Sequence, residues 1–573
     1  MPPRSELAPT LTTTKLTEMR WAVIVVGIAA LAVVSPFFFL GNASGHDFDF
    51  HVASWMDVAH QWREGVLFPR WAEWANFGFG EPRFIFYPPL SWILGAALGT
   101  VLPWRAVPGA LIWIFLLTAG MGAYRLSREW LGPAEAIAAA VFYAANPYHL
   151  VIVYYRSAFA ELLASVIFPF AVLAALRIGE RRAKALPHLA VAFALVWLSN
   201  APAAVIITYA LLLLLLVVSI VERSFSSLLW GAAAMATGLG LAAFYLIPAA
   251  WEQKWVQIQE VLAAVVGPEK NFLFSTGNDP EFVLFNWKVS SVAVGILLVT
   301  VLAAIAVNRW RKRMPELWWP LASLGILSTL MLLPVSLPLW NALPKLRFVQ
   351  FPWRWLIVLD LVFAVFLALA TSGKRGKWIW RSLIGALLIV SAILMVRDAW
   401  WDSDEVDDLA AAVISGKGYE GVDEYQPIGS DRRDLPSLTA KIRLETGESQ
   451  AIGGATGTRI HVERWSAEEK IFLLDSAHPE RVALRLLDYP AWRAEVNGTS
   501  TAIHARAGTA QMELAVPAGH NRVELRFTRT IDRRAGDAIS IVTAFSLLCF
   551  LLAEHRRKRQ QEGTPVPATE LGL

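Results

Sequence analysis

The feature that most constrains the fold is a series of apolar runs, each close to the length of a bilayer, with short basic clusters between them. A membrane-spanning helix needs ~20 mostly apolar residues, and residues 21–40 form such a run after Arg4, Lys15 and Arg20. With 56% apolar and 17% charged residues, the chain has more apolar surface than a water-soluble globule can bury. We therefore predict a polytopic α-helical membrane protein with an uncleaved first span and a cytoplasmic N-terminal tail, residues 1–20.

Basic clusters orient the later spans, because lysine and arginine accumulate in cytoplasmic loops. Four such clusters lie at 177–184, 309–313, 374–381 and 556–559. All four fall in the cytoplasm if the short stretch 88–102, which is interrupted by prolines and glycines and flanked by tryptophans, does not cross. The predicted spans are then 21–40, 107–124, 132–147, 161–178, 187–200, 201–221, 226–248, 288–308, 316–334, 353–372, 379–397 and 537–554. The sequence thus predicts about twelve spans in a bacterial inner membrane, with both termini cytoplasmic.

This topology divides the chain into a membrane domain and a large extracytoplasmic region. The predicted parts are a transmembrane domain at 21–397 with a first outer loop at 41–106, an extracytoplasmic region at 398–536, a last span at 537–554 and a cytoplasmic tail at 555–573. Apolar and polar residues alternate in short segments within 436–530, and Asn497-Gly498 is a hairpin-turn signal. We expect an extracytoplasmic β-sandwich there, which either contacts sugar or covers the site.

The first outer loop carries His46-Asp-Phe-Asp-Phe-His51 soon after the first span. Ionisable residues at the depth of a membrane are costly to bury, so they indicate a function by default. Asp47 or Asp49 could take a proton from an attacking hydroxyl. Alternatively, the two carboxylates could hold a divalent cation, magnesium or manganese, beside a leaving phosphate. A solvated loop that starts a helix, with Asp49 as its cap, is the non-functional interpretation.

Two further outer segments combine arginine with acidic or aromatic residues. In the segment 154–161, Arg156 could clamp a phosphate while Glu161 orients it. In the segment 346–354, aromatic rings surround Arg354, which suits a sugar carried on a lipid phosphate. The alternatives are a local ion pair in the first segment and an interfacial aromatic belt in the second.

Several kinds of site are absent from the sequence. No glycine-rich loop has the strand-to-helix context of a nucleotide site, so a soluble nucleotide-sugar donor is not supported. The single cysteine, Cys549, allows no disulfide and no cysteine-ligated metal within one chain. The net charge of +4 arises from short clusters between spans, so nucleic acid is not a predicted partner. The donor of any transferred group is therefore expected to be a membrane lipid.

A series of motifs along the chain resembles a known family. They are HDFDFH at 46–51, GVLFPRW at 65–71, GFGEPRFIFYPPL at 78–90, YRSAFAELLA at 155–164, QFPWRW at 350–355 and GYEGVDEYQP at 418–427. They resemble the bacterial membrane proteins called 6-pyruvoyl-tetrahydropterin synthase-related, which are similar to the YfhO-like proteins. Both groups look like members of the GT-C superfamily of glycosyltransferases. The residues DYPAWRAEVNG at 488–498 look like the outer β-domain of the YfhO-like group.

The resemblance implies a GT-C-like transferase that moves a sugar from a polyprenyl-phosphate-linked donor to an envelope glycan, lipid or protein on the outer face. It makes Asp47 the best match to the essential acidic residue of the first outer loop, with Asp49 second. The other polar residues of the motifs are then expected to bind the donor phosphate or the substrate: His46, His51, Arg70, Tyr87, Arg156, Glu161, Gln350 and Arg354. The alternatives are a transporter or flippase of a lipid-linked glycan and a non-catalytic envelope assembly protein.

Overall fold

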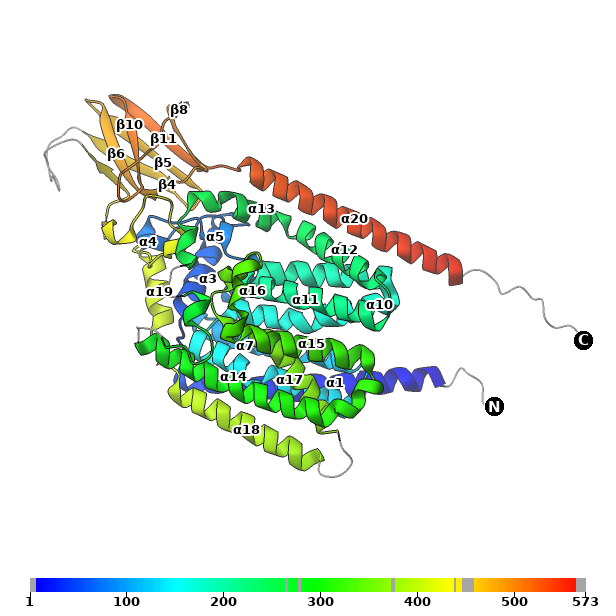
Figure 1. Cartoon of the computed structure of the whole chain (residues 1–573). Coiled ribbons are helices and arrows are strands. Elements are labelled where there is room, and N and C mark those ends of the chain that lie inside the picture. Colours follow the sequence, from blue (N-terminus) through cyan, green and yellow to red (C-terminus); the bar gives the residue numbers. More distant parts are fainter. Residues whose placement is uncertain are drawn as a thin grey trace, which may run out of the picture.

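The computed structural model describes residues 7–262, 266–276, 280–372, 377–436, 439–445 and 458–562. These residues form a bundle of long helices with a β-sheet region at one end (Figure 1). The first helix, α1 (Leu7–Val34), and the last, α20 (Ile531–Glu562), both reach the opposite end (Figure 1). One end of the bundle therefore carries the two termini and the other carries the β-region.

The bundle contains further long helices of the described residues and three short ones, α2, α9 and α16. They are α2 (Phe37–Leu40), α7 (Val107–Ser127), α8 (Pro133–Ala144), α9 (Pro147–Val151), α10 (Phe159–Ser199), α11 (Ala201–Val221), α12 (Ser226–Leu241), α13 (Ala243–Glu252), α14 (Pro280–Val307), α15 (Pro315–Met331), α16 (Leu337–Ala342), α17 (Leu356–Ala370) and α18 (Lys377–Asp398). Several begin with proline in the first turn, where the missing N–H is not needed for the helix. Proline thus marks helix starts in this chain without interrupting the apolar runs that follow.

Eight helical segments in the described part of the chain are long and apolar enough to cross a membrane. They are Leu16–Leu40, Trp104–Ser127, Pro133–Arg156, Phe159–Gly179, Ala201–Val221, Pro280–Lys312, Pro352–Ala370 and Ile531–Arg556. Two bent pairs, α12 with α13 and α15 with α16, raise the number to ten if each is one span. The predicted segments 187–200 and 379–397 are also helical, and the count of about twelve spans stays a prediction.

Helix α10 folds back on itself. A straight helix of its 41 residues would be about 60 Å long, twice the ~30 Å hydrocarbon thickness of a bilayer. Yet Glu161 near its start and Trp197 near its end line the same cavity. The segments Phe159–Gly179 and Lys184–Ser199 therefore run in opposite directions, as two successive membrane spans would.

The first outer loop is folded into short helices on the end of the bundle that carries the β-region. They are α3 (Phe48–Arg63), α4 (Ala75–Gly78), α5 (Arg83–Phe86) and α6 (Pro89–Gly99). The 11 residues of α6 extend only about 16 Å, which is too short to cross the membrane. Trp55 of α3 packs against Gly95 of α6, where a β-carbon would lie 2.3 Å from the indole ring. Glycine therefore allows α6 to pack closely on α3.

The β-region consists of two sheets that share one core. The first has the strand order β3-β6-β10-β9 and the second β4-β5-β11-β7-β8. The strands are β3 (Ile442–Leu444), β4 (Arg459–Trp465), β5 (Glu469–Ser476), β6 (Glu480–Leu487), β7 (Trp492–Val496), β8 (Thr499–Thr501), β9 (His504–Ala505), β10 (Gln511–Val516) and β11 (Gly519–Phe527). Phe472, Leu484 and Leu525 meet in the core. Asn497 and Gly498 have φ of 52° and 77°, so the predicted hairpin turn is present between β7 and β8.

The β-region rests on the first outer loop. Trp71 of the loop packs edge-on against Trp492, with 5.7 Å between ring centroids. Lys470 Nζ lies 2.9 Å from Glu73 Oε1, and the Leu487 amide donates to the Phe79 carbonyl across 3.0 Å. A second link precedes helix α19 (Glu405–Ile414), where β2 (Trp401–Asp402) pairs with β1 (Asn42–Ala43). These contacts hold the outer parts of the chain together above the bundle.

A buried ion pair joins α13 to the start of α20 below the β-region. Arg533 Nε and Nη2 lie 2.7 and 2.8 Å from the two carboxylate oxygens of Glu252, and the Tyr489 hydroxyl donates to the same carboxylate across 2.5 Å. Both charged side chains are at most 2% exposed. Each charge is therefore stabilised mainly by the other and by the tyrosine.

We expect Arg533→Met to destabilise the protein by about 3–5 kcal/mol, because it leaves the buried Glu252 without its counter-charge. Thermal unfolding of the detergent-purified protein measures this as a clear drop in melting temperature. The control, Arg433→Met, removes an arginine whose ion pair with Asp431 is exposed and should change the melting temperature little. Equal melting temperatures for the two variants would contradict this account.

Candidate active site

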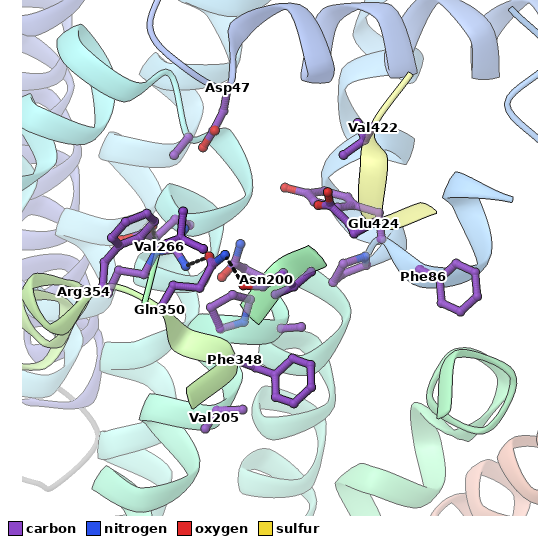
Figure 2. A pocket seen from close by; sticks show the side chains of 18 of the residues that line it. Asp47, Phe86, Asn200, Val205, Val266, Phe348, Gln350, Arg354, Val422 and Glu424 are labelled. Carbon is purple, nitrogen blue, oxygen red and sulfur yellow. Dashed lines mark hydrogen bonds and ion pairs between the residues drawn. The ribbon is translucent and has the colours of Figure 1, made fainter. Parts of the chain in front are cut away.

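A large cavity lies where the helical bundle meets the outer loops. Its volume is about 870 Å³, near the upper end of the ~300–1,000 Å³ found for small-molecule sites. Walls come from the start of α3, both ends of α10, the starts of α11 and α14, helix α13 and the segment before α17. Figure 2 shows Asp47, Arg354 and Glu424 around this space. The cavity is therefore built from segments that are far apart in the sequence.

Asp47 lies at the N-terminal end of α3 and faces the cavity. Its amide donates to the Arg156 carbonyl across 2.9 Å. The carboxylate is 41% exposed, and its Oδ2 lies 3.5 Å from Arg156 Nη2. Its side chain makes no capping bond to the helix. The backbone thus holds Asp47 in place while its carboxylate stays available to a ligand.

Asp49, two residues later, is absent from the cavity wall. It lies beside Glu405 at the start of α19, and Glu405 accepts a hydrogen bond from the Ser44 hydroxyl. Burial and the adjacent Asp49 carboxylate raise the pKa of Glu405 to about 9. The two adjacent carboxyl groups therefore share a proton at neutral pH. Asp49 links the first outer loop to α19, whereas Asp47 faces the cavity.

Two arginines and a glutamate form a buried charge network on the cavity wall. Arg156 Nη1 lies 2.5 Å from Glu161 Oε2, and Arg354 Nε lies 3.4 Å from the same oxygen. The Tyr148 hydroxyl donates to the other oxygen of Glu161. Arg354 also donates to the Val349 carbonyl across 2.8 Å. Two guanidinium groups thus share one buried carboxylate, and the partly exposed Asp47 carboxylate is the second negative charge beside them. An anion that displaces Asp47 from Arg156 therefore meets a net positive charge.

Aromatic rings surround this network. The guanidinium of Arg156 lies 4.7 Å from the centre of the Trp353 ring, and that of Arg354 lies 4.9 Å from the Phe351 ring. The rings exclude water and stabilise the cations through their negative faces. Burial of Arg156 and Arg354 is thereby made less costly, and their interaction with an incoming anion is strengthened.

Unusual backbone turns lie next to both arginines in the sequence and position them on the cavity wall. Residues 152–156 form a π-helical turn, a feature common at functional sites. It ends at Ser157, whose φ is +50°, and Ser157 Oγ donates to the Ala43 carbonyl across 2.6 Å. Gln350 before Arg354 also has a positive φ, +66°. Left-handed conformations at non-glycine residues cost about 1–3 kcal/mol each, so tertiary contacts hold both arginines in place.

Two histidines and a tyrosine complete the wall near Asp47. The Tyr87 hydroxyl lies 3.5 Å from His51 Nε2, and burial lowers the pKa of His51 to about 4. His46 packs edge-on against Phe285 at 4.8 Å, and its pKa is lowered chiefly by burial. Both imidazoles are therefore neutral at physiological pH and add no positive charge to the site.

Eight of the ten predicted site residues line this cavity: His46, Asp47, His51, Tyr87, Arg156, Glu161, Gln350 and Arg354. Asp49 and Arg70 do not. Arg70 lies over the Phe68 ring near Glu252 and Arg533, and burial lowers its pKa to about 10. Its guanidinium lies near Glu468 of the β-region instead, so a role of Arg70 in binding the donor stays a prediction.

The ten predicted site residues do not include other polar residues on the wall, among them Asn200, Glu281 and Glu424. Asn200 caps α11 by accepting from the Ala203 amide across 2.9 Å, which turns its side chain toward the cavity. Glu424 lies in the motif at 418–427, which the resemblance singled out without a role. Burial and the nearby carboxylates of Glu81 and Asp423 raise the pKa of Glu424 to about 7.

A divalent cation does not fit between Asp47 and Asp49. Their carboxylates diverge, one toward the cavity and the other toward Glu405. Within the described ranges, the group of carboxylate and imidazole ligands close enough to share an ion is His60, Glu64 and Glu73. Lys470 already neutralises Glu73 there.

Comparison with solved structures gives distant matches. The apo oligosaccharyltransferase of Archaeoglobus fulgidus is 15% identical with a TM-score of 0.38, over 68% of this chain and 56% of its own. ArnT from Cupriavidus metallidurans, bound to undecaprenyl phosphate, is 11% identical with a TM-score of 0.37, over 69% of this chain and 75% of its own. The chain thus spans little more than half the length of the archaeal enzyme. No curated protein matches the sequence.

A protein family gives the clearest match. The family described as "6-pyruvoyl-tetrahydropterin synthase related domain; membrane protein" matches residues 84–403. This range is more than half of the 573 residues, and it includes Arg156, Glu161 and Arg354 of the cavity wall. The chain therefore belongs to the 6-pyruvoyl-tetrahydropterin synthase related family of membrane proteins.

Proposed function

We propose that this protein is a GT-C-type membrane glycosyltransferase that moves a sugar from a polyprenyl-phosphate-linked donor to an envelope acceptor. The observation that carries the proposal is that Asp47, Arg156 and Arg354 face one cavity at the edge of the membrane bundle. A base for a hydroxyl and a cationic site for a phosphate thus lie together. These are the two groups that such a transfer requires.

The reaction follows from the charges in the cavity. An acceptor oxygen attacks the anomeric carbon of the donor sugar, and Asp47 takes the proton of that hydroxyl. The bond from the anomeric carbon to the phosphate oxygen breaks, and its electron pair leaves with the polyprenyl phosphate. Arg156 and Arg354 stabilise the charge on the leaving phosphate. Attack opposite the leaving group inverts the anomeric configuration.

Binding of the donor phosphate also frees the Asp47 carboxylate to act as the base. In the empty cavity, the Asp47 carboxylate lies 3.5 Å from Arg156 Nη2. A phosphate that binds Arg156 competes for the same guanidinium and releases Asp47 toward the acceptor. Glu161 remains paired with both arginines because it is 1% exposed and held by Tyr148. Glu161 therefore positions the arginines, while Asp47 is the base.

The proposed location is a bacterial inner membrane with the cavity on the outer face. The support is the distribution of basic residues: Arg309, Arg311 and Lys312 follow the end of α14, whose start lines the cavity. Since basic loops stay in the cytoplasm, the cavity and the β-region face outward. The donor lipid then enters the cavity from the outer leaflet.

We expect Asp47→Asn to lower sugar transfer by roughly 10²–10⁴-fold, because loss of a general base has effects of this size. The measurement is transfer of radiolabelled sugar from a panel of undecaprenyl-phosphate sugars by the purified protein. Asp49→Asn is the matched control, since this nearby aspartate lies off the cavity wall, and it should keep most of the activity. Full activity of Asp47→Asn would overturn the assignment. Movement of the lipid-linked sugar across a bilayer without transfer would favour the transporter reading.

The arginine network predicts a separate effect on phosphate binding. We expect Arg354→Gln to weaken binding of undecaprenyl phosphate, the lipid bound in the ArnT structure, by roughly 10–100-fold. A charge-assisted hydrogen bond contributes about 1.5–3 kcal/mol, which gives this range. Arg347→Gln is the control, because Arg347 is exposed and pairs with Glu269. Equal affinities of the two variants would argue against a phosphate at Arg354.

The orientation can be tested with single cysteines introduced into a Cys549→Ser background. In intact cells, a membrane-impermeant maleimide should label Ser500→Cys at the exposed β7–β8 hairpin and leave Arg311→Cys beyond α14 unlabelled. Permeabilised cells should show labelling at both positions. The opposite pattern would place the cavity on the cytoplasmic side.

A further inference from the structure

Glu424 belongs to a segment that closes the cavity from the outer side. The segment is held by contacts to two other outer parts of the chain. The Val422 amide donates to Glu81 Oε2 across 3.0 Å, and Gln426 Nε2 donates to Asn76 Oδ1 across 2.9 Å. The Gln426 carbonyl accepts from the Gln257 amide across 2.9 Å. These contacts fix the backbone on both sides of Glu424.

The Glu424 carboxyl itself points into the cavity (Figure 2). Its neighbour Asp423 is paired with Arg432 at 3.0 Å and points away from the cavity wall. No basic side chain in the described part of the chain forms an ion pair with Glu424. Burial raises the pKa of Glu424 to about 7, although its own backbone N–H and the Arg83 guanidinium act in the opposite direction. The half-buried carboxyl can therefore accept hydrogen bonds from a ligand or from water in the cavity.

The cationic side chains and the Glu424 carboxyl lie on different sides of the cavity. Arg354 lies on one side, and Glu424 projects from the opposite side (Figure 2). Arg156 lies with Arg354, because both arginines pair with the same oxygen of Glu161. A phosphate is attracted to the arginines and repelled by Glu424 in its ionised form. The part of a ligand that reaches Glu424 must therefore donate hydrogen bonds, as a hydroxyl or an ammonium group does.

The rings next to Glu424 favour a sugar. Tyr425 stacks on Phe86 with 6.0 Å between centroids and 8° between planes, and Tyr87 packs on Phe50 at 4.7 Å. Rings of this kind pack against the C–H faces of a sugar ring, while a carboxyl group accepts from its hydroxyls. The cavity of about 870 Å³ is also larger than a phosphate and one sugar require, so a second substrate fits beside the donor.

We propose that Glu424, with the rings of Tyr425 and Tyr87, forms an acceptor subsite that binds a carbohydrate through its hydroxyl groups. The role of this carbohydrate as the acceptor rests on the proposed function, whereas its binding depends only on the cavity. A hydroxyl held by Glu424 lies in the same space as Asp47 and the sugar of the donor. The outer segment therefore determines which acceptor can be used.

The test measures binding of two kinds of probe to the full-length purified protein. The carbohydrate probes are radiolabelled methyl glycosides of glucose, galactose, mannose, N-acetylglucosamine and glucosamine, and the phosphate probe is undecaprenyl phosphate. We expect at least one neutral glycoside to bind. Glu424→Gln should weaken that binding at least tenfold and leave undecaprenyl phosphate binding within twofold. Asp423→Asn, the matched control in the same segment, should leave both within twofold.

Each outcome decides a separate question. Failure of every neutral glycoside to bind the wild-type protein, or normal binding by Glu424→Gln, overturns the subsite. Binding of the glucosamine probe alone assigns it to an ammonium group and overturns the hydroxyl assignment. If the wild-type protein binds a glycoside but does not bind undecaprenyl phosphate, the proposed function is contradicted. The carbohydrate subsite is still supported in that case. If Glu424→Gln does not fold, Glu424→Asp retains the charge but withdraws the carboxyl by one methylene, and it should still weaken glycoside binding.

Discussion

The site depends on the sharing of one buried carboxylate, Glu161, by two arginines. Arg156 ends a π-helical turn, Glu161 lies in the first turn of α10, and Arg354 precedes α17. Two guanidinium groups could not be buried together without this negative charge, since uncompensated charges cost several kcal/mol each in a protein interior. Their attraction to Glu161 therefore holds three distant segments together and leaves one side of the arginines open to the cavity.

The cavity wall is formed by the helical bundle together with segments outside it. The first outer loop supplies Asp47, the segment at 418–427 supplies Glu424, and the β-region packs on the loop through Trp71 and Lys470. The bundle itself supplies Arg156, Glu161 and Arg354. With these segments in place, Asp47, the two arginines and Glu424 surround one space that is also lined by aromatic rings.

Much of this architecture follows from simple patterns in the sequence. Apolar length and basic clusters locate the helices, and alternation locates the β-strands, because both patterns are local. The motifs also contain just under half of the residues that line the cavity. The sequence could not separate Asp47 from Asp49, since the partner that turns Asp49 away, Glu405, lies more than 350 residues later. It gave no role to Glu424 either, because the burial that marks this residue arises only from tertiary packing.

The central claim is that a lipid phosphate binds between Arg156 and Arg354 in the cavity that Asp47 faces. A cryo-electron microscopy structure of the protein in nanodiscs with saturating undecaprenyl phosphate tests it most directly. The account predicts phosphate density in contact with both guanidinium groups, with the Asp47 carboxylate turned away from Arg156. Phosphate density elsewhere on the protein, or an unaltered Asp47–Arg156 pair with an empty cavity, would contradict it.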